Sequence, residues 1–186
     1  SDPLQELTIQ GEGKEKVLVI SISGVISTTP RQSFLRTMPS IVQETVAQLK
    51  KAEQDKNIKC LLIKVDSPGG TVTAGDMIYH EIMAYKKKTG VKILVSMMGT
   101  AASGGYNVTM PADTIMAHPT TITGSVGVII MQPNVSGLMD KIGVEMRVSK
   151  SGAEKDMGSP FRAATPEEEE LLKGVTDDLA RRFLRL

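Results

Sequence analysis

Apolar runs of strand length alternate along the first half of this chain with longer segments of helical spacing. The strand-like runs are Val17–Ser23, Ile58–Val65 and Val91–Met97, and the helical segments between them are Pro39–Asp55 and Thr73–Lys88. Helices of this length between strands are typical of βαβ units, in which right-handed crossovers connect parallel strands. The alternation therefore predicts an α/β fold with a mainly parallel sheet.

The second half of the chain shows shorter and less regular patterns. We expect strands at Thr114–Ala117, Val126–Ile130 and Val144–Val148, and a short helix at Val135–Ile142. These segments continue the alternation of strand and helix. They therefore predict the same α/β class as the first half of the chain.

The last segment carries its own helix-start signal. Thr165-Pro166-Glu167-Glu168 combines an N-cap residue, a proline at the first helical position and a glutamate at N3. An apolar stripe follows at helical spacing, and it packs either on the chain's own domain or on a neighbouring subunit. The stripe comprises Leu171, Leu172, Val175, Leu179 and Phe183.

Composition limits the size and the partners of the molecule. With 186 residues, 40% of them hydrophobic, the chain can bury one core, so we expect a single domain over residues 1–186. Residues 1–16 form an N-terminal extension in this interpretation, and residues 163–186 form a C-terminal helix suited to oligomerisation. A net charge of +1 and an aromatic content of 3% argue against nucleic acid as a partner.

Several kinds of cofactor site are missing from the sequence. One cysteine and two histidines provide no zinc-type cluster, so we expect no metal. The chain has neither a Walker loop nor a GxGxxG fingerprint, so we expect no nucleotide and no other cofactor. It also has no apolar run of about 18 residues, the length that spans a bilayer, so we expect the chain as given to be soluble.

Two clusters of small residues follow neighbouring strand-like runs. Asp66–Thr71 follows the second run, and Met98–Tyr106 follows the third and surrounds Ser103 with glycine and alanine. The carboxyl ends of parallel strands meet at one edge of the sheet, where α/β proteins bind ligands. A serine between this strand and the helix-compatible segment Tyr106–Ala112 has open space and outward-pointing N–H groups. Small residues also allow tight crossings, and a Pro-Gly-Gly corner can be an ordinary turn, so both simpler interpretations stay open.

Four motifs together resemble the SppA family of signal peptide peptidases, serine–lysine peptidases of the ClpP/crotonase fold. The motifs are Asp66–Thr71, Ala101–Tyr106, Thr123–Val128 and Lys150–Asp156, and they occur in the family's order. The resemblance extends from about residue 17 to about residue 162. It implies a single domain built from repeated ββα units around a mainly parallel sheet.

The resemblance also implies roles for individual residues. Ser103 corresponds to the family's nucleophile, Lys155 to its general base, and Ser125 to the serine that orients the lysine. The implied reaction is hydrolysis of a peptide bond through an acyl-enzyme. Backbone N–H groups that hold the oxyanion would come from Gly69, Gly70 and Gly104.

The residues themselves are compatible with a lysine as base. His80 falls in a helical pattern and His118 precedes a proline, so both are better interpreted as packing or surface residues than as a triad histidine. A free lysine has a pKa of about 10.4, and lowering it to about 7 costs roughly 4–5 kcal/mol, which burial can supply. Lys150 is the nearest competitor of Lys155, and we expect it to be exposed.

Partners and location follow from the resemblance alone. It implies signal peptides or similar unfolded, apolar peptides as substrates, and a homo-oligomer in which Ser103 of one subunit can meet Lys155 of the next. It also implies a bacterial-type membrane protein with an extracytoplasmic catalytic domain and an anchor that this chain lacks. Two alternatives stay open: a crotonase-type acyl-CoA enzyme, which needs no serine nucleophile, and a non-catalytic peptide-binding or membrane-scaffold protein.

Overall fold

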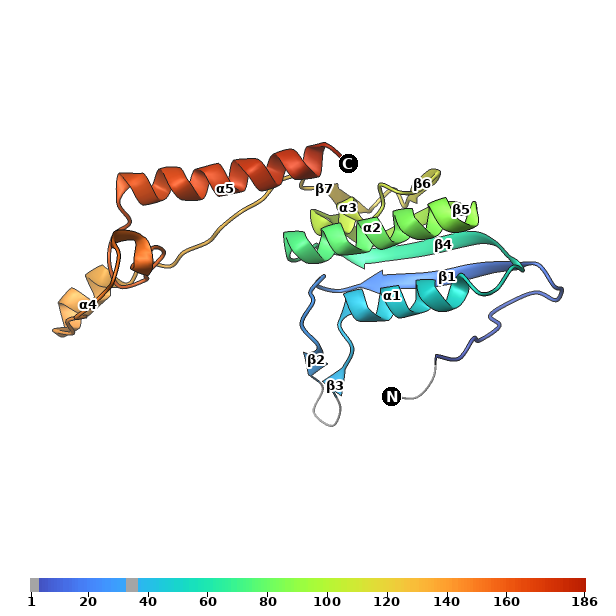
Figure 1. Ribbon diagram of the computed structural model, residues 1–186, viewed down its shortest axis with the longest axis horizontal. Coiled ribbons are helices and arrows are strands. Elements are labelled where there is room, and N and C mark those ends of the chain that lie inside the picture. Colours follow the sequence, from blue (N-terminus) through green and yellow to red (C-terminus); the bar gives the residue numbers. More distant parts are fainter. Residues whose placement is uncertain (1–3, 33–36) are drawn as a thin grey trace. The chain divides into compact units, whose positions relative to one another are not determined.

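A computed structural model describes residues 4–32 and 37–186 of the chain (Figure 1). These residues divide into two compact units, which we call unit 1, up to Val126, and unit 2, Gly127–Arg185. Most of the strands lie in unit 1, whereas unit 2 is helical with long connecting segments. The expectation of one domain with an N-terminal extension and a C-terminal helix stays a prediction.

Unit 1 is built on a parallel sheet. Strands β1 (Lys16–Ser23), β4 (Ile58–Ser67), β5 (Lys92–Ala102) and β6 (Thr114–Ala117) lie in that order, and β7 (Ile122–Gly124) also pairs with β5. Every pairing within this sheet is parallel, which confirms the predicted α/β class with a mainly parallel sheet. A separate antiparallel pair is formed by β2 (Arg31–Gln32) and β3 (Thr37–Met38).

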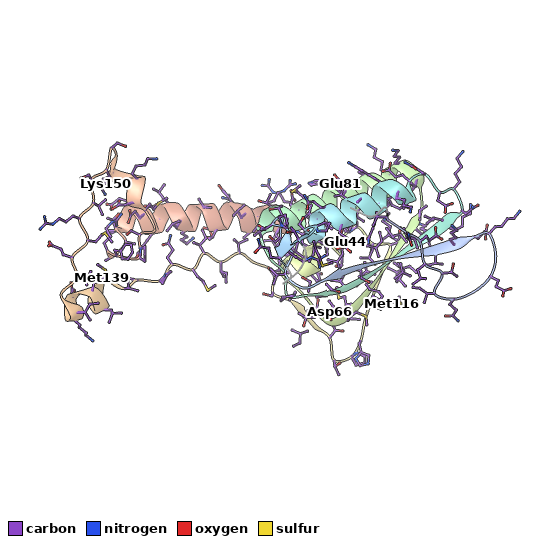
Figure 2. All side chains as sticks on the ribbon, turned by 90° about the horizontal axis from the view of Figure 1, so that it is seen from below. Glu44, Asp66, Glu81, Met116, Met139 and Lys150 are labelled. Atoms are coloured by element: carbon purple, nitrogen blue, oxygen red, sulfur yellow. The ribbon has the colours of Figure 1, made fainter. Side chains whose placement is uncertain are left out.

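Two helices cover one face of this sheet. Helix α1 (Ile41–Ala52) connects β1 to β4, and α2 (Val72–Thr89) connects β4 to β5. Because both right-handed crossovers step across the sheet in the same direction, both helices fall on the same side, as Figure 2 shows. The alternation of burial along the strands agrees with this arrangement. Side chains buried between the sheet and the helices include Ile22, Leu61, Ile63, Val65, Ile78, Ile82, Ile93 and Val95.

The segment after β5 is less helical than its sequence suggests. Helix α3 spans only Gly104–Asn107, and turns follow it, so the expected helix over Tyr106–Ala112 is mostly absent. Pro111 has no N–H to continue a helix, and Thr109 uses its hydroxyl to donate a hydrogen bond to the carbonyl of Tyr106 at 2.7 Å. The end of β5 therefore leads into a single helical turn.

Unit 2 contains α4 (Ser136–Ile142), the 3₁₀ turn η1 (Ala153–Asp156) and α5 (Pro166–Leu184). Both α4 and the C-terminal helix were expected, and α5 begins with the capping box formed by Thr165 and Glu168.

The strands expected at Val126–Ile130 and Val144–Val148 are wrong. Neither segment is assigned as a strand in the described residues, and apolar side chains such as Ile129 are exposed. β-branched composition favours an extended backbone, but a strand also needs a neighbour to satisfy its N–H and C=O groups. Beside β5 that place belongs to Ile122–Gly124 instead.

Two kinds of feature are absent from the described residues. None of the helices in residues 4–32 and 37–186 combines the length and the apolar character needed to cross a bilayer. Over the same residues, no three His, Cys, Asp or Glu side chains gather as a metal-binding group would require.

Candidate active site

Ser103 lies directly after β5 in a backbone conformation that serine rarely adopts. Its φ is 51° and its ψ is −122°, and its side chain is half-buried. The surrounding backbone maintains this geometry: the Ser103 N–H donates to the Gly124 carbonyl at 2.9 Å, and the Ser103 carbonyl accepts from Tyr106 and Asn107 at 2.9 and 3.0 Å. Such a conformation costs on the order of 1–3 kcal/mol and is concentrated at functional sites.

The Gly69–Gly70 corner after β4 approaches the backbone beside Ser103. A methyl group built on Gly69 would lie 2.8 Å from the nitrogen of Gly104, and one built on Gly104 would lie 3.4 Å from the nitrogen of Gly70. Gly69 also has φ +102°, a left-handed conformation that favours glycine. The two clusters of small residues therefore meet at one edge of the sheet, as the sequence predicts.

The backbone N–H groups at this junction differ in their partners. The Gly69 N–H donates to the Ser67 hydroxyl at 3.1 Å, and that hydroxyl donates in turn to the Gly24 carbonyl at 2.7 Å. Within the described residues, the N–H groups of Gly70 and Gly104 have no recorded acceptor. Two unpaired donors beside a serine hydroxyl can stabilise a negative oxygen that develops next to that serine.

The corner is held rigidly between β4 and α2. Ile26 donates its N–H to the Gly69 carbonyl at 2.8 Å and accepts from the Thr71 N–H at 3.0 Å. A methyl group on Gly70 would lie 1.9 Å from the Ile26 carbonyl oxygen, so only glycine fits there. Thr71 then caps α2 through its side chain. The position of the Gly70 N–H is thus set by neighbours on both sides.

Ser125 lies in the chain that runs beside Ser103. It is exposed, its φ is 51°, and it follows Gly124, whose carbonyl accepts the Ser103 N–H. The Thr123 hydroxyl donates to the Ala101 carbonyl at 2.8 Å and so helps to hold β7 beside β5. Unit 1 therefore brings the serine, the glycine corner and Ser125 into one region.

Lys155 belongs to unit 2. It lies in η1, its side chain is exposed, and its backbone N–H donates to the Gly152 carbonyl at 3.3 Å. The competitor Lys150 is engaged, since its ammonium group donates to the Ala153 carbonyl and to the Asp156 carboxylate, both at 2.7 Å. Ser103 and Lys155 thus lie in different units.

Two residues that the sequence did not single out hold the backbone near the candidate residues. Ser67 is fully buried, and its position two residues before Gly69 is a recognisable signal, because serine hydroxyls accept from the N–H two residues on. Arg162 bridges Asp156 and Glu168 in unit 2. No local pattern pointed to Arg162, because its partners come together only when α5 and η1 fold.

A strained serine after a strand, with unpaired N–H groups beside it, can support acyl transfer to the serine oxygen. The model of peptidase family S49 matches residues 85–186. The chain belongs to this family.

Known relatives agree with this assignment. Over its whole length the chain is 37% identical to an Enterococcus faecium protein named "Putative signal peptide peptidase SppA", of which it covers 54%. It is 30% identical over 87% of its length to "Serine protease SPPA, chloroplastic" of Arabidopsis thaliana, covering 24% of that protein. With "Protease 4" of Salmonella typhi it shares 34% identity over 76% of its length, covering 23% of that protein. The chain thus spans about half, or less, of the length of these relatives.

Among solved structures, the chain shows a partial likeness to a ClpP1 mutant of Listeria monocytogenes. The TM-score is 0.44 at 25% sequence identity, and the match covers 55% of this chain and 52% of the other.

Proposed function

We propose that this chain is the catalytic part of a serine peptidase with Ser103 as nucleophile and Lys155 as general base. The observation that carries the proposal is the strained Ser103 beside the unpaired N–H groups of Gly70 and Gly104. Membership of peptidase family S49 supports peptide-bond hydrolysis as the reaction.

The proposed reaction has two halves. The neutral amine of Lys155 takes the proton from the Ser103 hydroxyl, and the hydroxyl oxygen attacks the peptide carbonyl carbon. The resulting oxyanion accepts hydrogen bonds from the two N–H groups. The C–N bond then breaks, and the leaving amine receives the proton from Lys155. Lys155 then takes a proton from water, and the resulting hydroxide attacks the acyl carbon. The bond between that carbon and the Ser103 oxygen breaks, and Lys155 returns the proton to Ser103.

The oxyanion donors in this proposal are Gly70 and Gly104. Gly69 is an equal candidate from the sequence, but its N–H donates to the Ser67 hydroxyl. Its positive φ instead allows the turn of the backbone that positions Gly70. The single turn of α3 is too short for a substantial helix dipole, so the two individual N–H groups provide the stabilisation.

Lys155 is the better candidate for the base because Lys150 is held in an ion pair with Asp156. We assign Ser125 to orient the Lys155 amine, since its chain runs beside Ser103. A lysine acts as a base near neutral pH only when it is shielded from water. Lys155 is exposed on unit 2, so the proposal requires the active assembly to cover it.

This requirement supports a homo-oligomer in which the serine and the lysine of one site can come from different subunits. We extend the proposal to signal peptides and other unfolded, apolar peptides as substrates, because a relative carries the name signal peptide peptidase. On the same ground we propose an extracytoplasmic, membrane-associated location in a bacterial-type cell.

Ser103→Ala and Lys155→Ala test the two central roles. Each variant should lose peptide cleavage by on the order of 10³-fold or more, since removing one member of a catalytic unit disables the whole. A fluorophosphonate probe should label the parent protein at Ser103 and leave Ser103→Ala unlabelled. Ser96→Ala on β5 and Lys141→Ala on α4 are matched controls and should keep parental activity. Cleavage that survives either central substitution would reject the role assigned to that residue.

A further inference from the structure

Unit 2 contains an ion-pair network centred on Arg162, next to the candidate base. The Arg162 guanidinium donates to both oxygens of Asp156 at 2.9 Å and to Glu168 Oε2 at 2.8 Å, and it also contacts Glu168 Oε1. It donates further to the backbone carbonyl of Asp156 at 3.3 Å. One side chain thus joins two acidic residues and a carbonyl group.

The network is anchored in the first turn of α5. Glu168 is the N3 residue of the capping box, and its Oε2 also accepts the Thr165 N–H at 2.9 Å. Its side chain is only 1% exposed, which is unusual for a glutamate on such a helix. The start of α5 therefore fixes Glu168, and Glu168 fixes Arg162.

The other end of the network holds the turn that carries Lys155. Asp156 is the last residue of η1 and follows Lys155 directly in the chain. Lys150 completes the attachment, because its ammonium group donates to the first carbonyl of the turn, that of Ala153, and to Asp156. Both ends of η1 are therefore tied down, while the Lys155 side chain remains exposed.

A buried ion pair is weak evidence for stability, because desolvation offsets much of its Coulomb energy. A guanidinium group instead fixes the orientation of the carboxylate that it binds, because its N–H groups donate to both carboxylate oxygens in one plane. A catalytic base needs such orientation, because a misplacement of about 1 Å can cost roughly 100-fold in rate.

The network also determines the charge beside Lys155. Two carboxylates flank Lys155 in the chain, Glu154 before it and Asp156 after it. Arg162 and Lys150 hold the pKa of Asp156 well below the usual range. With two cations already bound to Asp156, the carboxylate is not free to pair with the Lys155 ammonium. Without Arg162, Asp156 keeps Lys150 as its one remaining cation in the network, and its second oxygen is left to attract the Lys155 ammonium. That attraction would favour the ammonium form, which cannot accept a proton.

We infer that Arg162, anchored by Glu168, is a positioning residue that orients η1 and keeps Asp156 from pairing with Lys155. The inference rests on the proposed function, because it assigns Arg162 a task in placing the base. In this role Arg162 acts through Asp156 and η1.

The test measures peptide cleavage by Arg162→Met from pH 6 to 10, with unfolding by urea recorded for each variant. We expect kcat to fall about 10- to 100-fold. We also expect the pH of half-maximal activity to rise by about 1 unit or more, because an opposite charge stabilises the ammonium form. Arg147→Met is the matched control, since Arg147 is 91% exposed, and it should leave both quantities unchanged.

A second variant separates positioning from folding. Adding Asp156→Asn to Arg162→Met removes the freed carboxylate, so the half-maximal pH should return toward the parental value while kcat stays low. If Arg162→Met does not fold, Arg162→Lys takes its place and should show a smaller shift in the same direction. An unchanged pH profile in the folded variant, whatever its kcat, would overturn the inference. Failure of the proposed function has a different result, namely cleavage that persists in Lys155→Ala.

Discussion

Ser103 and Ser125 share a positive φ of 51°, and they are the non-glycine residues of the described chain with this feature. Strain of this kind persists only where neighbours hold it in place. The neighbours of Ser103 are the Gly124 carbonyl and the first turn of α3, which together accept and donate three hydrogen bonds. At the scale of single residues, the site is therefore defined by backbone hydrogen bonds more than by side-chain contacts.

Ser67 is the side chain that holds the glycine corner, and Ser67→Ala tests this. The substitution leaves the Gly69 N–H and the Gly24 carbonyl without the buried hydroxyl that joins them. We expect the free energy of unfolding to fall by about 1–3 kcal/mol, the cost of unsatisfied buried groups, and probe labelling of Ser103 to slow. Urea unfolding and labelling kinetics measure the two effects.

Ser96→Ala is the control for this substitution. Ser96 lies on the neighbouring strand β5, and its hydroxyl donates a long hydrogen bond to the Met98 sulfur at 3.7 Å. Its replacement should change the free energy of unfolding by less than about 0.5 kcal/mol. Equal costs at the two serines would contradict the role given to Ser67.

At the scale of elements, β5 organises the site. Its first half pairs with β6 and its second half with β7, while β4 flanks it on the other side. This double pairing brings the Gly124–Ser125 chain beside the end of β5, where Ser103 follows. The apolar run Val91–Met97 predicts the start of β5, but the strand continues through Gly99 to Ala102, because tertiary pairing with β7 satisfies its backbone.

The capping box formed by Thr165 and Glu168 stabilises the start of α5, and Thr165→Ala tests this contribution. Thr165 accepts the Glu168 N–H at 3.2 Å, so its loss should destabilise unit 2 by about 1 kcal/mol. The measurement is thermal or urea unfolding followed by circular dichroism at 222 nm.

Thr176→Ala serves as a counter-test on the same helix. The Thr176 hydroxyl donates back to the Lys173 carbonyl at 2.8 Å in mid-helix, where alanine has the higher helix propensity. This variant should be neutral or slightly more stable than the parent. A destabilisation as large as that of Thr165→Ala would show that capping is not the cause.

At the scale of the whole molecule, each unit contains a carboxylate with a depressed pKa. In unit 1 the Ile93 N–H, with help from Lys86 and Lys92, lowers the pKa of Asp113 from 3.8 to about 2. In unit 2 Arg162, with the Thr165 N–H, lowers the pKa of Glu168 from 4.5 to about 2. A lowered folded-state pKa contributes stability above the unfolded-state value and loses that contribution as pH falls toward the folded-state value.

We therefore expect stability to be maintained down to about pH 4.5 and to fall between there and pH 2. Asp113→Asn should be less stable than the parent at pH 7, and its stability should decline less over the acidic range. Urea midpoints at pH 7, 4, 3 and 2.5 check both statements. Glu15→Gln, an exposed change in the same unit, should follow the parent curve. Parallel curves for Asp113→Asn and the parent would show that Asp113 does not contribute to the pH dependence.

Local patterns determined β1, α1, β4, α2, the start of β5, β6 and the start of α5. Alternating apolar runs, glycine corners and the Thr-Pro-Glu-Glu signal act over a few residues, so a sequence expresses them directly. The same reasoning failed at Val126–Ile130 and Val144–Val148, because an extended run becomes a strand only when another strand is available to pair with it.

Only the tertiary structure shows which N–H groups and which lysine are already engaged in hydrogen bonds. The choice of Gly70 over Gly69 depends on the Ser67 hydroxyl, and the exclusion of Lys150 depends on its bond to Asp156. The ion pairs of Arg162 could be recognised only in the folded chain, because α5 places Glu168 beside Arg162. In each case several neighbours could bind the same hydrogen-bonding group. The arrangement of the folded chain determines which neighbour does so, and spacing along the sequence does not.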